Sequence, residues 1–117
     1  MQTRMLLGLV LTIILASAAL GLAQTATIEG TWEAAPNAEA HKVLKKVGSG
    51  SYSLLTTVAM PETSFRDQGN ALGQVYCYQV QGTNSSGDGP LSAEQCVMPV
   101  IVPGAVGNFN LSVTIVP

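Results

Sequence analysis

Six short segments with strand character follow one another along the chain, and no window of the sequence shows a sustained helical period. Turns that contain Gly, Pro, Asn or Ser separate them. The segments are 26–32, 41–46, 52–58, 63–67, 74–83 and 91–98. Segments of this length and spacing, with turn residues between them, are typical of an antiparallel sandwich. The sequence therefore predicts an all-β antiparallel β-sandwich.

The clearest strand, residues 74–83, has two faces of different character. Tyr76, Tyr78 and Val80 share one face, and Cys77 shares the other face with two glutamines. Because side chains alternate between the two sides of a strand, we expect the tyrosine face to point into the core. Residues 26–32 follow the same period, with Ile28 and Trp32 on one face.

The first 23 residues have the composition of a secretory signal peptide. Arg4 is their only charge, residues 5–15 are an apolar run, and small residues follow up to Ala23. A positive start, an apolar centre and a small-residue exit are its three parts. We expect cleavage after Ala23, with Ala19 and Gly21 as alternative sites. The other interpretation is an uncleaved membrane anchor, for which residues 5–23 are barely long enough.

The mature chain predicted by that cleavage, residues 24–117, carries four Lys or Arg and seven Asp or Glu, a formal net charge of −3. An acidic, charge-poor chain lacks the basic face that nucleic-acid binding needs, so no nucleic-acid partner is expected. Residues 42–46 hold three of the four cations, and we interpret them as a solvated strand end. Two Cys and one His are too few for a zinc site of four Cys and His ligands, and no cofactor or metal is expected.

Cys77 and Cys96 are the only cysteines. Export places them in an oxidising compartment, where two cysteines favour one disulfide. If the last hairpin loop is centred between Ser86 and Gly87, Cys77 lies directly opposite Cys96. Opposed residues of antiparallel strands approach to about 4.5 Å between Cα atoms, within reach of a disulfide. We expect a stabilising bridge on the outer face of the sheet, worth about 3 kcal/mol.

Several of these residues occur in the order found in one known family. The matching positions are Trp32, Pro36, residues 41–45, residues 63–67, Leu72 and Gly73, and above all residues 76–84 with Gly87, Ser92 and Cys96. Over residues 27–99 the chain resembles a fibronectin type III domain of the bacterial secreted kind, in the variant with a Cys on each of the last two strands. The resemblance implies an immunoglobulin-like β-sandwich.

The roles that the resemblance implies are structural. Tyr76 stands where the family has its tyrosine-corner residue, whose hydroxyl is tied to nearby backbone. Trp32, Val43, Tyr78 and Val80 are expected in the core.

His41 departs from the family pattern, since it stands where an aromatic residue is usual. One interpretation is a partly buried or edge His that a neighbour satisfies. The other is a pH-sensitive or metal-contacting group. Because the chain has no second His and no cysteine outside the expected disulfide, the first interpretation is favoured.

We expect the family's first strand to be absent from the mature chain, because only residues 24–27 precede Ile28. At the other end, residues 100–117 continue beyond the last expected strand, and residues 103–114 resemble the beginning of a further domain. Within this tail the apolar residues alternate with polar ones, as in a strand with one apolar face. The alternating apolar residues are Phe109, Leu111, Val113 and Ile115.

Three interpretations of this tail stay open. It is a remnant, or it packs on its own domain, or it fills the first-strand position of the next molecule as a donor strand. A first strand begins at the pole opposite the end of the last strand, and residues 99–104 form a short, stiff connection. Donation between molecules would be head to tail and open-ended.

No catalytic signature is present in the sequence. It has no Gly-rich phosphate loop, no paired carboxylates at useful spacing and no Gly-x-Ser-x-Gly elbow, and His41 has no evident partner for nucleophilic catalysis. Residues 85–89 contain no Arg-Gly-Asp motif. An enzyme is therefore the least favoured function.

These observations predict a secreted, non-enzymatic structural or adhesive module, at the cell surface, outside the cell or in a periplasm. Its expected partner is a protein, either a second copy or another extracellular protein, and the tail at residues 106–116 would serve self-assembly. The alternative is a monomeric module that binds a ligand such as a surface glycan through the loops around Asn37, Gly50 and Ser86. A membrane is involved only if the N-terminal segment stays uncleaved.

Overall fold

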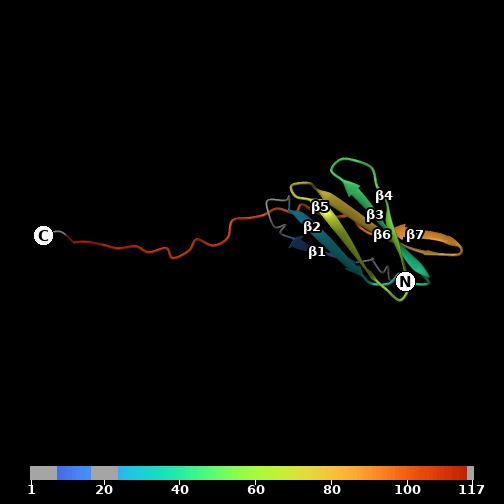
Figure 1. The fold of residues 1–117 in the computed structure, drawn as a ribbon. Helices are drawn as coiled ribbons and strands as arrows, with labels where there is room; N and C mark the ends of the chain where they lie inside the picture. The colour runs from blue at the N-terminus through green and yellow to red at the C-terminus, as the bar shows by residue number, and fades with distance from the viewer. Residues whose placement is uncertain (1–7, 17–23, 116–117) are drawn as a thin grey trace.

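The computed structural model describes residues 8–16 and 24–115, and these form two antiparallel sheets packed as a sandwich (Figure 1). The first sheet has the order β1-β2-β5, with β1 at Leu9–Ala16, β2 at Thr25–Trp32 and β5 at Ser64–Ala71. The second sheet has the order β4-β3-β6-β7, and β8 also pairs with β6. Its strands are β3 (Ala40–Val47), β4 (Ser53–Ala59), β6 (Tyr76–Asn84), β7 (Gly87–Leu91) and β8 (Gln95–Val97). The expected all-β sandwich is confirmed.

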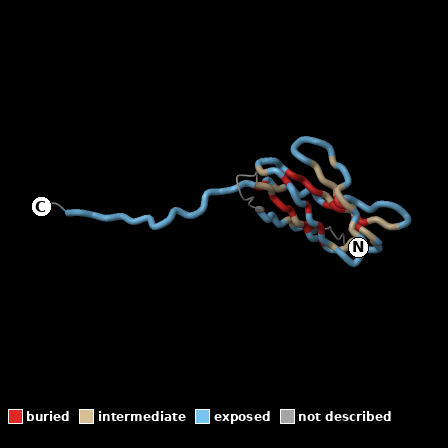
Figure 2. Tube along the Cα trace, viewed as in Figure 1, coloured by how far each residue is buried: buried red, intermediate tan, exposed pale blue. Residues whose placement is uncertain are grey.

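The core lies between the two sheets, and Figure 2 shows buried residues along the strands of the sandwich and none along the tail. Alternation along each strand produces this arrangement, since every second residue points inward. The central buried cluster comprises Leu9, Ile28, Trp32, Val43, Phe65, Tyr76, Tyr78 and Val80.

Gly30 allows the close packing of β2 against β5. It pairs with Phe65 of β5, and a Cβ atom at Gly30 would overlap the Phe65 ring. The aromatic ring therefore occupies the space that a side chain at Gly30 would need, which explains a glycine inside a central strand.

In the uncut chain a first strand is present, whereas its absence from the mature chain after cleavage stays a prediction. Leu9–Ala16, from the segment with signal-peptide composition, forms β1 and pairs antiparallel with β2 over its whole length, from Leu9 opposite Trp32 to Ala16 opposite Thr25. An eight-residue apolar run suits both the apolar centre of a signal peptide and an edge strand of a sheet. The sequence alone therefore could not distinguish the two. The proposed cleavage sites after Ala19, Gly21 and Ala23 lie outside the described residues.

The last hairpin pairs the cysteines as expected, through a different turn. Asn84 pairs with Gly87, so the turn consists of Ser85 and Ser86 and is centred earlier than the sequence analysis assumed. A register shift between Gln81 and Thr83, and a break between β7 and β8, place additional residues on the returning strand. These irregularities restore the alignment, and Cys77 lies opposite Cys96.

Beyond β8 the chain leaves the sandwich. Pro99 is fully buried, and its carbonyl accepts a hydrogen bond of 2.8 Å from the Gly73 amide. Residues 100–115 are exposed and contain no strand, and they extend away from the two sheets (Figure 1). In the described ranges, 8–16 and 24–115, no helix has the length and apolar character needed to cross a membrane.

Candidate functional site

The tail presents four large apolar side chains to solvent. Phe109, Leu111, Val113 and Ile115 are between 72% and 89% exposed. Proteins rarely leave such side chains uncovered next to one another, so contiguous exposed apolar residues mark interaction sites. The structure thus places the expected donor residues outside the sheets, at the surface.

The edge strand β1 is the other half of the candidate site. Leu9 is 3% exposed and Leu11 packs against the core, while Val10 on the opposite face is 64% exposed. The strand lies at the edge of the three-stranded sheet and has β2 as its sheet neighbour. A strand at this edge of β2 therefore covers the part of the core beside Trp32.

Tyr76, at the tyrosine-corner position, contacts backbone that is nearby in the sequence. The Tyr76 hydroxyl donates a hydrogen bond of 2.8 Å to the carbonyl oxygen of Ala71. This bond ties the start of β6 to the end of β5 in the opposite sheet. Trp32, Val43, Tyr78 and Val80 all lie in the buried core.

The disulfide expected from the sequence is present between Cys77 and Cys96, with Cα atoms 4.0 Å apart. Cys77 is buried, whereas Cys96 and the neighbouring Glu94 are exposed. These three residues lie close enough to hold an ion. Because both sulfur atoms are in the disulfide, neither is available as a thiolate ligand. The bridge therefore has a structural role.

His41 is fully buried beside Trp32, with 5.4 Å between the two ring centroids. Its Nε2 atom accepts a hydrogen bond of 3.0 Å from the Ala35 amide, which leaves the proton on Nδ1. His41 Nδ1 and Trp32 Nε1 are both buried without a hydrogen-bond partner in the described chain. Burial lowers the pKa of the imidazole, so the neutral form is the one that fits this site.

A polar cluster that sequence analysis missed joins the two sheets. Asp67 of β5 accepts a hydrogen bond of 2.7 Å from the Tyr78 hydroxyl and forms an ion pair of 2.7 Å with Lys45. Lys45 also donates to Asn70 at 2.6 Å. Burial, followed by the bond to Asp67, raises the pKa of Tyr78. The sequence held one indication of this cluster. Lys45 lies on the same strand face as Val43, an expected core residue, and this placement argues against a solvated lysine.

The other two lysines of residues 42–46 are also paired. Lys42 contacts Asp88 at 3.0 Å, and Lys46 contacts Glu94 at 3.2 Å. The expected basic strand end is thus neutralised by three acidic residues, one for each lysine.

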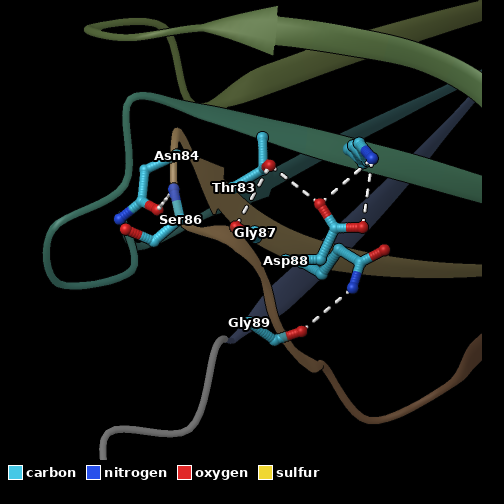
Figure 3. A network of polar contacts seen from close by, with 8 residues as sticks. Thr83, Asn84, Ser86, Gly87, Asp88 and Gly89 are labelled. Carbon is cyan, nitrogen blue, oxygen red and sulfur yellow. Dashed lines mark hydrogen bonds and ion pairs between the residues drawn. The ribbon is translucent and has the colours of Figure 1, made fainter.

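One polar network covers the hairpin between β6 and β7 (Figure 3). The Thr83 hydroxyl donates to Asp88 at 2.8 Å, and Lys42 approaches the same carboxylate. The bond from Thr83, followed by that from Lys42, lowers the pKa of Asp88. Gln81 donates to the Gly89 carbonyl at 2.9 Å. These polar groups bind one another and hold the hairpin in one shape.

Two of the three loops named as alternative ligand contacts lie together. Asn84 donates to the carbonyl oxygen of Asn37 at 3.0 Å, and Ser85 donates its amide to Glu39 at 2.9 Å. The Ser86 amide is bound by the Asn84 side chain at 2.8 Å. The loops around Asn37 and Ser86 therefore meet at one pole, with many of their polar groups already engaged.

The third loop lies at the other pole. Gly50 follows β3, whose last residue, Val47, pairs with Tyr76 at the start of β6. The amide of the adjacent Gly48 donates to the Val75 carbonyl at 2.8 Å. The three loops therefore do not form one common surface.

Comparison with solved structures was made on this fold. An Fn3-like protein from Clostridium thermocellum is 30% identical, with a TM-score of 0.53, over 66% of this chain and 81% of that protein. The sixth fibronectin type III domain of a human fibronectin type III domain containing protein is 20% identical, with a TM-score of 0.56, over 69% and 79% of the two chains. The chain belongs to the fibronectin type III-like family.

More distant structures agree on the fold of this fibronectin type III-like domain. The twitchin kinase region from C. elegans is 15% identical, with a TM-score of 0.54. The match covers 62% of this chain and only 14% of that much longer protein. No family model and no curated protein sequence matches the chain.

An open depression of the fibronectin type III-like domain lies on the outer face of the three-stranded sheet. Its lining includes Glu29, Thr31 and Arg66. Glu29 and Arg66 pair with each other at 3.3 Å. The two charges offset one another, and the hydroxyl residues Thr31 and Ser64 line the same depression.

Proposed function

We propose that this fibronectin type III-like domain is a secreted, non-enzymatic structural module that links to a second copy of itself through its C-terminal tail. The observation that carries the proposal is the full exposure of the four alternating apolar residues of the tail. An extended segment with this pattern adds to the edge of a sheet, where backbone hydrogen bonds supply affinity and alternate side chains supply specificity.

The rest of the surface supports a structural role. The polar side chains of the hairpin and of residues 42–46 are engaged in pairs, and the cysteines are bonded to each other. A site for chemistry needs unsatisfied polar groups that converge in a concave pocket. The described surface offers an exposed apolar tail instead, which supports joining between modules.

The test is the solution mass of the exported protein. The full coding sequence is expressed with residues 1–23 intact, the protein is collected outside the cytoplasm, and its N-terminus is sequenced. Light scattering over a concentration series should show oligomers whose mass grows with concentration. A chain that ends at Pro99 should remain a monomer, because residues 100–117 supply the link.

Two outcomes contradict the proposal. Retention of the protein in the cytoplasm argues against secretion. Monomers of equal stability with and without the tail argue against linkage, and the search then moves to glycan or protein ligands of the loops around Asn37 and Ser86.

A further inference from the structure

The tail repeats the apolar period of β1. Each apolar residue on the Leu9 face of β1 has a counterpart in the tail at the same spacing. The counterparts are Leu9 and Phe109, Leu11 and Leu111, Ile13 and Val113, and Leu15 and Ile115. On that face Leu9 is buried and Leu11 packs against the core, whereas Ile13 and Leu15 are 36% and 45% exposed. Because a strand presents every second residue to one face, the tail can present four apolar side chains on the face that carries Leu9 and Leu11 in β1.

The outer faces of the two segments differ, and the tail is the better edge strand. In β1 the outward positions hold Val10 and Ile14, which are 64% and 41% exposed. The equivalent outward positions in the tail are Asn110, Ser112 and Thr114. A strand with an apolar inner face and a polar outer face suits a sheet that is buried on one side only. The tail therefore fits the β1 position with polar residues along its outer face.

The path of the chain favours a partner molecule over self-insertion. Pro99 is bonded to Gly73, just after β5, and β5 pairs with Thr25 at the pole where β1 ends. To enter the β1 position in the direction of β1, the tail must begin at the opposite pole, beside Trp32. Residues 100–108 of the same chain can span about 30 Å at most. These residues would have to run back along the length of β1, about 25 Å, and the chain would have to reverse its direction twice.

A second copy placed end to end removes that difficulty. The tail of one copy leaves its own domain at the pole where β1 ends. It enters the domain of the next copy at the pole where β1 begins. The tail would continue in the direction in which it already extends (Figure 1). Such a link is heterologous and repeats from copy to copy, so it builds open chains.

From these relationships we propose that the edge of β2 is the acceptor for residues 109–115 of a second copy, and that Leu9–Ala16 occupies this edge until it is removed. This inference rests on the proposed function, because it names the acceptor of the tail and the step that regulates it. While β1 belongs to the same chain, its effective concentration at the edge exceeds that of any free tail. Cleavage between β1 and β2 ends this advantage and opens the position to the tail.

The experiment uses the full chain with residues 17–23 replaced by the recognition sequence of a specific protease. The uncut protein should be a monomer, since β1 covers the acceptor. After cutting, light scattering should show the mean mass rise by about twofold or more, because each link joins at least two copies. Mass spectrometry of the separated assembly should show that the fragment containing β1 has been lost.

Two tail variants form a matched pair. Leu111→Asp places a charge on the face that enters the core, and the cut protein should stay monomeric. Asn110→Asp adds the same charge to the adjacent residue on the outer face, and the cut protein should assemble like the unchanged chain. Equal aggregation of both variants would mean nonspecific association and would overturn the inference.

A cross-link tests the register even if the cut protein is only partly assembled. Thr12 lies opposite Glu29 in the structure, so Ser112 of the incoming tail should take the same place. Glu29→Cys in one copy and Ser112→Cys in another should form a linked dimer after cutting. Leu111→Cys, one residue away and on the other face, should not link with Glu29→Cys.

The outcomes separate this inference from the proposed function. If the uncut chain assembles through its tail as strongly as the cut chain, linkage stands and the β2 edge is not the acceptor. If the cut chain stays monomeric while its tail becomes resistant to proteolysis, the tail closes on its own domain and donation between copies is wrong. If the cut chain is monomeric with a protease-sensitive tail, both are wrong.

Discussion

Leu9 of β1 lies directly opposite Trp32 of β2, and both side chains are buried in the core. A residue from the segment with signal-peptide composition thus covers one of the largest side chains of the sandwich. The domain with β1 in place has a complete core, and the same edge is what a donated tail would have to fill. The relationship between these two residues therefore links the stability of the domain to the proposed assembly.

Truncation of Leu9 should destabilise the full chain much more than truncation of its neighbour. Leu9→Ala removes a buried side chain and should lower the free energy of unfolding by about 2–4 kcal/mol. Val10→Ala changes an exposed position and should alter it by less than about 0.5 kcal/mol. Urea unfolding followed by Trp32 fluorescence measures both variants. Equal effects would show that β1 does not pack on the core in solution.

Loss of Asp67 should be costly, because Lys45 and Tyr78 then keep partly buried polar groups without their partner. Asp67→Ala should lower the free energy of unfolding by about 3 kcal/mol. Lys42→Ala, which breaks the exposed pair with Asp88, should cost less than about 1 kcal/mol.

The double variant Lys45→Met, Asp67→Leu sharpens this prediction. It removes both charges together, so it should be more stable than Asp67→Ala alone. Chemical denaturation of the three variants at neutral pH provides the comparison. A double variant that is less stable than Asp67→Ala would mean that the ion pair itself supplies net stability.

Acid should destabilise the domain through His41. Its pKa in the folded chain is lowered from the ordinary value of 6.5, so the unfolded chain binds the proton more strongly. The stability contribution is complete above about pH 6.5 and is lost as the pH falls toward the lowered pKa, by up to about 1.4 kcal/mol per pH unit. Protonation of Nε2 would also break its bond with the Ala35 amide.

Urea unfolding at pH 5, 6, 7 and 8 tests the role of His41. The unchanged chain should lose stability between pH 6.5 and 5, whereas His41→Phe should show a flat profile over this window. A flat profile for the unchanged chain, or the same slope in both proteins, would assign no role to His41.

A side chain at Gly30 should disturb the packing of the two neighbouring strands. Its Cβ atom would overlap the buried ring of Phe65, so Gly30→Ala should cost about 1–3 kcal/mol. Gly104→Ala is the matched control, because nothing lies within 4 Å of the added carbon and the residue is exposed. Thermal unfolding should show a lowered midpoint for Gly30→Ala alone, and an unchanged midpoint would mean that the Phe65 ring moves aside at little cost.

Features that depend on the local side-chain period were predictable from the amino-acid sequence. Alternation along residues 74–83 assigned Tyr76, Tyr78 and Val80 to one face, and all three are buried. The order of strands and turns led to the sandwich, and the spacing of Cys77 and Cys96 led to their disulfide. These features were predictable because the side-chain period of a strand is set by its own backbone.

Features that depend on partners distant in the sequence became visible in the folded chain. The tertiary structure placed Leu9–Ala16 at the edge of β2, turned Lys45 toward Asp67 in the other sheet, and brought Asn37 beside Asn84 but not beside Gly50. An apolar run of eight residues looks the same in a leader and in an edge strand, and a lysine in a strand has no visible partner in its own segment. The packing of the two sheets against each other decides which strand lies at a sheet edge. It also decides which carboxylate faces a given lysine.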